Sequence, residues 1–143
     1  MEYVYSAKIE PDPDGGFLVT FPDVPEAITG GDNLTEARDN ATEALGLALR
    51  GYLVYDRPLP TRKTRRKGLV PVPVDPATAL KLAVVEAFVA SGMSKSELAR
   101  RLGKAETEAR RILDPDHPTK LPLLRAALAV LGKEIIVSVR DAA

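Results

Sequence analysis

Acidic side chains are concentrated in the first part of this 143-residue chain. Residues 1–56 hold 11 Asp and Glu but only 3 Lys and Arg, although the whole chain is formally neutral. A metal-dependent nuclease needs several carboxylates that converge from core strands, whereas these lie in expected turns and on one exposed helical face. Acidic groups in turns are usually just solvated, and the alternative is a surface that attracts a basic partner. The candidate contact residues are Asp12, Asp14, Asp23, Glu26, Glu36, Asp39 and Glu43.

Cysteine and histidine, the usual residues of metal and nucleophile sites, are almost absent. The sequence has no Cys and one His, which excludes disulfides, thiolate metal sites and His-cluster zinc sites. His117 is the one candidate base for a Ser-based triad, and prolines flank it in the turn over residues 114–118. We interpret it as a solvated loop histidine. The sequence predicts no catalytic residue, no metal ligand and no cofactor.

The second half contains the spacing of a helix-turn-helix. Ala99 is small enough to let two helices approach, Gly103 permits a tight turn, and Ile112 faces inward from the next helix. That second helix would enter the major groove of DNA. The residues best placed for bases and phosphates are Ser94, Lys95, Ala105, Glu106, Thr107, Arg110 and Arg111. The alternative is a helical bundle whose basic residues are simply solvated.

Charge limits how tightly a single copy of this motif would bind DNA. Residues 76–143 carry 11 basic and 8 acidic side chains, and Glu106 and Glu108 lie at the DNA-facing end of the second helix. Lys104 occupies a position that is usually apolar in this motif. Because one copy offers few phosphate contacts, we expect a homodimer or higher homo-oligomer. The expected interface is a terminal strand that pairs with its twin through Ile135, Ile136, Val137 and Val139.

Alternating and helical periodicities define the elements expected in the first half. Residues 3–9 and 17–21 alternate around a Pro- and Gly-rich turn, which predicts a β-hairpin, and residues 27–29 predict a short third strand. Asn33 begins a capping-box pattern. Apolar residues spaced by three and four then predict a helix over residues 34–50 that stops at the following glycine.

A basic, proline-containing segment separates the two halves. Residues 57–67 lack apolar periodicity, so we favour a flexible linker, open to proteolysis, over an arm that contacts phosphate or an acidic partner. Residues 69–74 alternate Val and Pro, which fits an edge strand of the first domain or a stiff connector. The expected domains are residues 1–56, extended to 75 if this strand belongs to them, a linker over 57–75, and residues 76–143.

The first half resembles a known protein family. The run DGGFLVTFPDVPEAITGGDNLTEA at residues 14–37 is similar to the signature of HicB-type antitoxins, and the similarity covers about residues 3–56. The helix-turn-helix and the terminal strand resemble the DNA-binding half of many members. The resemblance implies an α+β fold, in which a β-β-β-α-β partial RNase-H-like domain precedes a helical domain that ends in a β-strand.

The same resemblance implies a function for each half. The first domain would bind and occlude a small basic HicA-type toxin, an mRNA interferase, and the acidic residues would attract it. The second would bind operator DNA and repress its own operon, so the chain would not be an enzyme.

Two other functions stay open. One is a helix-turn-helix transcription regulator that responds to a small ligand, and the other is a metal-dependent nuclease. No apolar run approaches the roughly 20 residues needed to span a bilayer, and the first residues lack the pattern of a signal peptide. We therefore expect a cytoplasmic protein that does not bind a membrane.

Overall fold

The computed structural model describes residues 1–63 and 67–142 of the chain. These residues form two compact units, Met1–Pro76 and Ala77–Ala142. The first unit combines an antiparallel sheet with one long helix, and the second unit is helical. The chain therefore has the α+β class that its sequence predicts.

An antiparallel sheet forms the base of the first unit. Its strands, in the order β3-β2-β1-β4, are β1 (Val4–Pro11), β2 (Phe17–Thr20), β3 (Ile28–Gly31) and β4 (Val70–Pro73). Strands β1 and β2 form the predicted hairpin, with Pro11 opposite Phe17. Asp12 shapes the turn, because its Oδ1 accepts the backbone N–H of Asp14 at 2.9 Å. The third predicted strand is confirmed as β3.

Strand β4 lies at the edge of the sheet, as its prolines predict. It pairs with β1, and Val72 lies opposite Tyr5 with both side chains buried. Pro71 and Pro73 are exposed. A proline has no backbone N–H to donate to a neighbouring strand. At the edge of a sheet the missing N–H faces solvent, so no carbonyl of a neighbouring strand is left without a donor. Of the two sequence interpretations of residues 69–74, the strand is confirmed.

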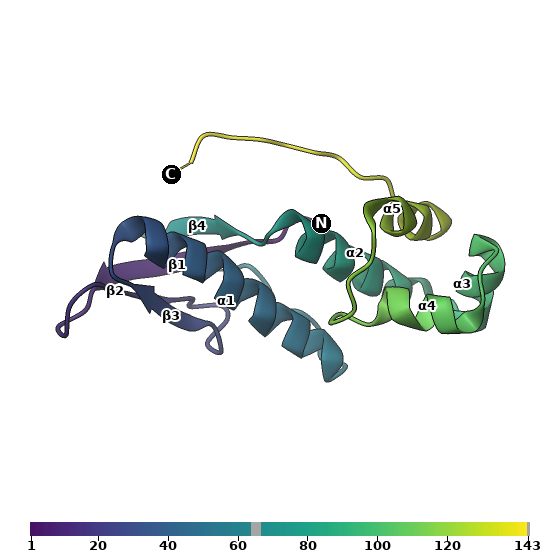
Figure 1. Ribbon diagram of the computed structural model, residues 1–143, viewed down its shortest axis with the longest axis horizontal. Helices are drawn as coiled ribbons and strands as arrows, with labels where there is room; N and C mark the ends of the chain where they lie inside the picture. The colour runs from purple at the N-terminus through teal and green to yellow at the C-terminus, as the bar shows by residue number, and fades with distance from the viewer. Residues whose placement is uncertain (64–66, 143) are drawn as a thin grey trace. The chain divides into compact units, whose positions relative to one another are not determined.

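Helix α1 (Leu34–Val54) packs along one face of the sheet (Figure 1). It begins at the predicted cap, where Asn33 Oδ1 accepts the backbone N–H of Glu36 at 2.9 Å. The predicted apolar stripe faces the sheet and buries Ala37, Ala41, Leu45 and Leu49 completely. The facing core of the strands includes Tyr5, Ala7, Val19 and Phe21.

The helix continues beyond Gly51, so the predicted end at this glycine is wrong. Tyr52 follows directly and is 9% exposed, so the extra turn buries an aromatic ring. A glycine inside a helix costs only about 1 kcal/mol relative to alanine, which is less than burial of a tyrosine ring contributes. The helix ends instead at Tyr55, whose N–H donates to the carbonyl of Gly51.

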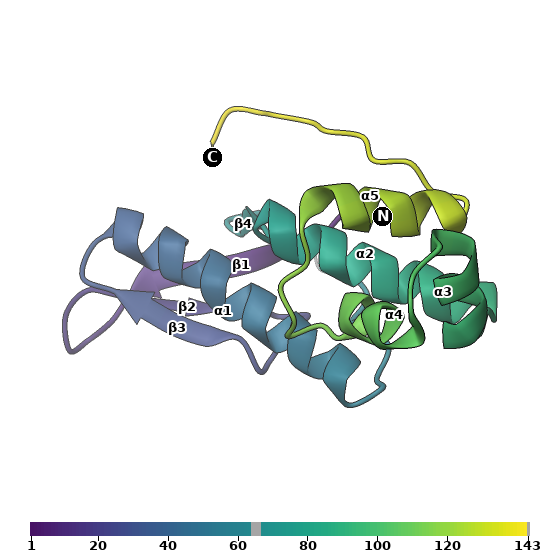
Figure 2. The same ribbon diagram turned by 45° about the vertical axis from the view of Figure 1, so that its right-hand side comes forward.

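The second unit is built from helices that enclose an aliphatic core (Figure 2). They are α2 (Pro76–Ser91), α3 (Lys95–Leu102), α4 (Glu106–Leu113) and α5 (Leu121–Val130). Each contributes fully or almost fully buried side chains, among them Leu82, Val84, Leu98, Ile112 and Leu124. Pro76 occupies the first helical position of α2, where a backbone N–H is not needed. Within the described residues no single helix is long and apolar enough to cross a membrane, and α2 and α3 meet that requirement only together, as a pair bent by 116°.

The C-terminal tail does not form the predicted strand within this chain. Residues 133–142 leave α5 as an extended segment without strand pairing (Figure 1). A strand needs a neighbour for its backbone groups, and the tail has none among the described residues. Its apolar side chains accordingly remain exposed, Ile136 at 84%, Val137 at 82% and Val139 at 92%.

Candidate functional site

Helices α3 and α4 pack as the two helices of a helix-turn-helix. Ala99 and Ile112 are 4% and 0% exposed. Gly103 adopts a left-handed φ of 65°, and the N–H of Lys104 donates to the carbonyl of Ala99 at 2.9 Å, which ends α3 and turns the chain. Ser94 Oγ accepts the backbone N–H of Glu97 at 3.1 Å and caps α3. The small residue, glycine and apolar residue in the sequence pattern therefore have the structural roles predicted for them.

A buried lysine on α2 holds the end of α4. Lys81 is 5% exposed, and its ammonium donates to the carbonyls of Ile112 at 2.8 Å and Arg111 at 3.1 Å. It also donates to Thr119 Oγ1 at 2.6 Å. Burial lowers the pKa of Lys81 to about 8, against the opposing charge of Asp114. Sequence reasoning missed this residue, although a lone lysine inside the apolar stretch of α2 was the available signal.

The residues predicted to contact DNA are exposed around the start of α3 and along α4. This holds for Ser94, Lys95, Ala105, Glu106, Thr107, Arg110 and Arg111. The hydroxyl of Ser94 is engaged in capping α3, so its side chain serves the helix itself. Glu106 accepts a hydrogen bond from Ser96 Oγ at 3.1 Å, which links the starts of the two helices.

The arginines of these two helices are paired with glutamates of their own helix. The pairs are Arg100–Glu97 at 2.5 Å, Arg101–Glu97 at 2.7 Å, Arg110–Glu106 at 3.1 Å and Arg111–Glu108 at 3.6 Å. Hydrogen bonds from Arg100 and then Arg101 lower the pKa of Glu97. Residues 94–113 carry six basic and three acidic side chains, so the motif keeps a net charge of +3, although DNA would have to compete with these pairs for the arginines.

The acidic residues predicted to attract a basic partner lie in three places on the first unit. Asp12 and Asp14 are in the β1–β2 turn, Asp23 and Glu26 are in the β2–β3 loop, and Glu36, Asp39 and Glu43 are exposed along α1. The turn and the loop lie at opposite ends of the sheet, because β1, β2 and β3 are antiparallel neighbours. Among the residues described, no three His, Asp or Glu side chains come together in a way that would hold a metal ion.

The first part of the basic segment packs on the first unit, which corrects the interpretation of residues 57–67 as a flexible linker. We call residues 57–63 the basic strap. Arg57 lies over the ring of Tyr52, 4.3 Å from its centroid, and is 3.9 Å from Glu26. The carbonyl of Pro60 accepts a hydrogen bond from the Tyr5 hydroxyl at 2.8 Å.

The end of the strap is held in the same way. Arg62 lies over the rings of Tyr3 and Tyr5, 5.8 and 5.6 Å from their centroids. The backbone N–H of Lys63 donates to Asp23 Oδ2 at 3.0 Å. Residues 64–66, also part of the predicted linker, lie outside the described residues. The strap is ordered because tyrosine rings and carboxylates of the first unit supply partners for its cations and backbone.

Three of the seven candidate carboxylates accept hydrogen bonds within the chain itself. Asp12 accepts one from its own turn, Asp23 accepts from the strap, and Glu26 accepts from the Tyr52 hydroxyl at 2.6 Å. This bond lowers the pKa of Glu26, and Arg57 adds to the effect. Burial, followed by the bond to Glu26, raises the pKa of Tyr52. The acidic groups left for another molecule are those of the β1–β2 turn and of α1.

Comparison with known proteins identifies the family. A family profile described as "HicB_like antitoxin of bacterial toxin-antitoxin system" matches residues 4–83. The chain is 35% identical over 133 residues to Antitoxin HicB of Escherichia coli (strain K12), covering 92% of this chain and 95% of that protein. It is 38% identical over 131 residues to Antitoxin HicB 2 of Photorhabdus laumondii, with 92% of each covered, and 34% identical over 141 residues to Antitoxin HicB of Pseudomonas fluorescens, with 98% and 96% covered. The chain belongs to the HicB family of antitoxins from bacterial toxin–antitoxin systems.

Proposed function

We propose that this chain binds and neutralises a HicA-type toxin, an mRNA interferase, and represses its own operon by binding operator DNA. The observation that carries the proposal is its similarity to HicB antitoxins along 92–98% of its length. Antitoxins of this family act by binding and not by catalysis, so the metal-dependent nuclease loses its support. The proposal places the chain in the cytoplasm, where messenger RNA and the operator are found.

The charge of α1 supports the toxin-binding half of the proposal. Asp39 and Glu43 are exposed one turn apart, and among the described residues neither takes part in an ion pair. An acidic surface of this kind speeds the approach of a basic, RNA-binding protein and competes with its RNA. We infer that the outer face of α1, together with Asp12, Asp14 and Glu36, contacts the toxin.

Cleavage of RNA by the toxin encoded beside this gene tests that half. An excess of this chain should form a stable complex with the toxin and stop cleavage. Glu43→Lys should weaken the complex about tenfold at low salt and less at high salt, because it reverses an attraction across the interface. Glu2→Lys makes the same change at an exposed residue outside α1 and should have little effect. Full toxin activity in the presence of excess protein would refute the proposed function.

The helix-turn-helix supports the DNA-binding half. Its core residues and turn place α4 on the surface, with Arg110 and Arg111 exposed. Replacing both arginines with alanine should weaken binding to the palindrome upstream of the gene. The slope of the logarithm of the binding constant against the logarithm of the salt concentration should also become shallower, by about one unit for each phosphate that the arginines neutralise. Arg125→Ala, on the exposed side of α5, is the matched control. An unchanged gel shift for the double variant would mean that another face binds DNA.

The exposed tail supports a homodimer or higher oligomer. Two tails pairing as antiparallel strands would satisfy their backbone groups and cover Ile136, Val137 and Val139. Ile136→Asp should then shift the protein to monomer in sedimentation velocity, whereas Ala126→Asp on the exposed side of α5 should not. An Ile136→Asp variant that sediments like the wild type would exclude the tail as the interface.

A further inference from the structure

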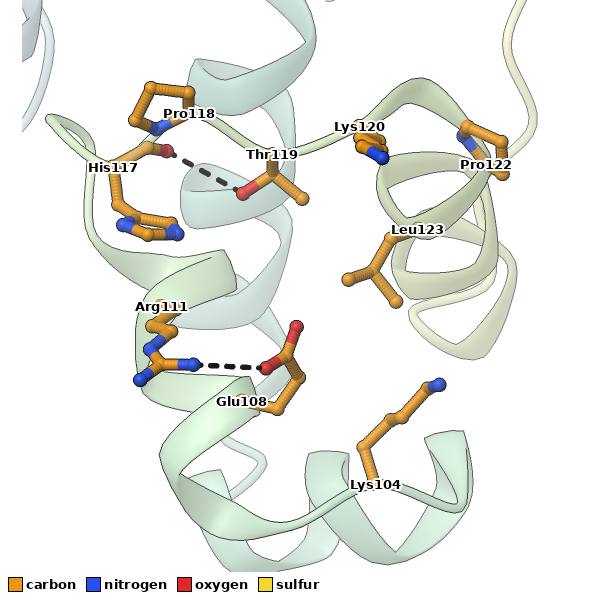
Figure 3. A pocket seen from close by; sticks show the side chains of 9 residues that line it. All are labelled: Lys104, Glu108, Arg111, His117, Pro118, Thr119, Lys120, Pro122 and Leu123. Atoms are coloured by element: carbon orange, nitrogen blue, oxygen red, sulfur yellow. Dashed lines mark hydrogen bonds and ion pairs between the residues drawn. The ribbon is translucent and has the colours of Figure 1, made fainter.

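A basic cavity lies beside the helix-turn-helix. It has a volume of about 470 Å³ and opens between the α3–α4 turn, α4, and the loop that leads into α5. Arg111 and His117 line one side, and Lys104 and Lys120 the other (Figure 3). The apolar wall between them includes Leu123. His117, interpreted from sequence as a loop histidine without a role, is thus part of a cavity lined by cationic side chains from three segments.

The lining carries a net positive charge. Lys104 and Lys120 form no ion pair among the described residues, and both are exposed. Glu108 is the acidic residue of the lining, and it lies 3.6 Å from Arg111, which it neutralises in part. An anion entering the cavity would therefore meet the ammonium groups of Lys104 and Lys120. It would also meet the guanidinium of Arg111, whose ion pair with Glu108 is long and weak.

Two features of the fold behind the lining add positive potential. The buried ammonium of Lys81 donates to Thr119 Oγ1 at 2.6 Å, and Thr119 lines the cavity. Helix α5 also begins here, with Lys120 as its N-cap and no side-chain cap. Pro122 offers no N–H and the N–H of Leu123 already donates to the carbonyl of Lys120 at 3.1 Å, so the start of α5 attracts an anion through its dipole. The buried ammonium, the start of α5 and the lining cations all favour the same sign of ligand.

We propose that this cavity is a phosphate-binding site that takes a backbone phosphate of DNA flanking the bases read by α4. This inference rests on the proposed DNA-binding function. A phosphorylated small molecule carries the same chemical group, and the experiment below distinguishes it from DNA. Arg111 lies on α4 itself and Lys104 lies two residues before its start, so a phosphate held here would be adjacent to the helix in the groove. It also gives the unusual lysine at position 104 a role, because the side chain faces the cavity and not the core.

The single histidine of the chain makes the site directly observable. In the full-length protein labelled with ¹⁵N, the imidazole signals of His117 have no counterpart elsewhere in the sequence. Titration with inorganic phosphate, against sodium chloride of equal ionic strength, should shift these signals saturably. Lys104→Gln with Lys120→Gln should weaken that binding at least tenfold. Arg125→Gln with Lys133→Gln removes the same charge from exposed positions outside the cavity and should leave it unchanged.

Operator DNA added to the same sample separates the two sources of phosphate. If the operator binds, measured by fluorescence anisotropy, and shifts His117, the DNA backbone is the ligand and the proposal stands. If inorganic phosphate shifts His117 but the bound operator does not, the DNA source is refuted and a small phosphorylated ligand takes its place. If the operator binds while neither addition moves His117, the cavity proposal is refuted and the DNA-binding function survives. If the operator does not bind at all, the proposed function fails, and the phosphate titration alone decides whether an anion site exists.

Discussion

Replacing Lys81 with methionine should destabilise the second unit, and the loss should grow as the pH rises from 7 to about 9.5. Lys81 is 5% exposed and donates three hydrogen bonds that tie α2 to the end of α4 and to the following loop. Methionine is similar in length and volume but donates nothing. The carbonyls of Arg111 and Ile112 and the hydroxyl of Thr119 would lose their shared partner.

Two opposing contributions set the size of the effect at pH 7. A buried acceptor that loses its donor costs about 1–3 kcal/mol, and the backbone of Ile112 belongs to a fully buried residue. In the other direction, methionine removes the penalty of burying a charge. The pKa of Lys81 falls from 10.5 to about 8, and each pH unit corresponds to about 1.4 kcal/mol before solvent screening is allowed for. The two nearly cancel, so the net loss at pH 7 should be about 0–2 kcal/mol.

The pH dependence has a definite sign. Because burial lowers the pKa of Lys81 in the folded state, the unfolded chain binds more protons between about pH 8 and 10.5, and wild-type stability rises with pH there. From pH 7 to about 9.5 the rise is about 1–2 kcal/mol, the lower value allowing for solvent screening. Methionine does not titrate, so the wild type gains stability over the Lys81→Met variant by that amount.

Urea unfolding can separate the two units in the full-length protein. The four tyrosines, at positions 3, 5, 52 and 55, all lie in the first unit, so tyrosine fluorescence follows that unit alone. Circular dichroism at 222 nm also follows the helices of the second unit. Lys81→Met should shift the dichroism transition and leave the fluorescence transition at pH 7 in place, and the exposed Lys133→Met should shift neither. A difference from wild type that stays flat or shrinks as the pH rises would refute the argument from burial.

Three further substitutions test the first unit and the DNA-facing helix. Gly31→Ala should destabilise the first unit by more than about 2 kcal/mol, because the new Cβ would lie 2.5 Å from the backbone nitrogen of Ala37 in α1. A Cβ added at Gly51, inside α1, would meet open space, so Gly51→Ala should stabilise the first unit by about 0.5–1 kcal/mol. Unfolding followed by tyrosine fluorescence measures the effect of both glycine substitutions. Glu106→Gln should raise operator affinity a few-fold at low salt, because it removes a negative charge near phosphate and releases Arg110. If anisotropy shows no gain, α4 does not face DNA.

Elements whose determinants are close together in the sequence could be predicted. The β1–β2 hairpin depends on a short turn between alternating segments, and the cap at Asn33 acts on an N–H three residues away. The end of helix α1 depends on a distant partner and was predicted wrongly, because Tyr52 finds a buried site and the helix passes Gly51. The tail was predicted to pair with a second copy of the chain, so that pairing stays a prediction although the tail has no strand partner among the described residues of one chain.

The same distinction explains what was missed at the candidate sites. The spacing of Ala99 and Gly103 predicted the helix-turn-helix because the two residues act within one local motif. Most contacts of the basic strap join residues far apart in the sequence, among them the bond between Lys63 and Asp23, 40 positions apart, and the bond between Tyr5 and the carbonyl of Pro60, 55 positions apart. No local pattern contains such pairs. The only signal in the sequence for these contacts is the excess of acidic residues before residue 57 and of basic residues directly after it.

Charge segregation along the sequence is reduced, and not abolished, by contacts within the chain. The strap is bound to the acidic unit and offsets part of its charge, and the arginines of α3 and α4 are paired with glutamates beside them. A partner responds to what is left: the carboxylates of α1 and the β1–β2 turn in the first unit, and the lysines of the basic cavity in the second. Salt dependence should therefore follow these residual groups and not the totals of each half. A charge reversal at Asp23 or Glu26 would act first on the strap and on folding, and only through them on a toxin.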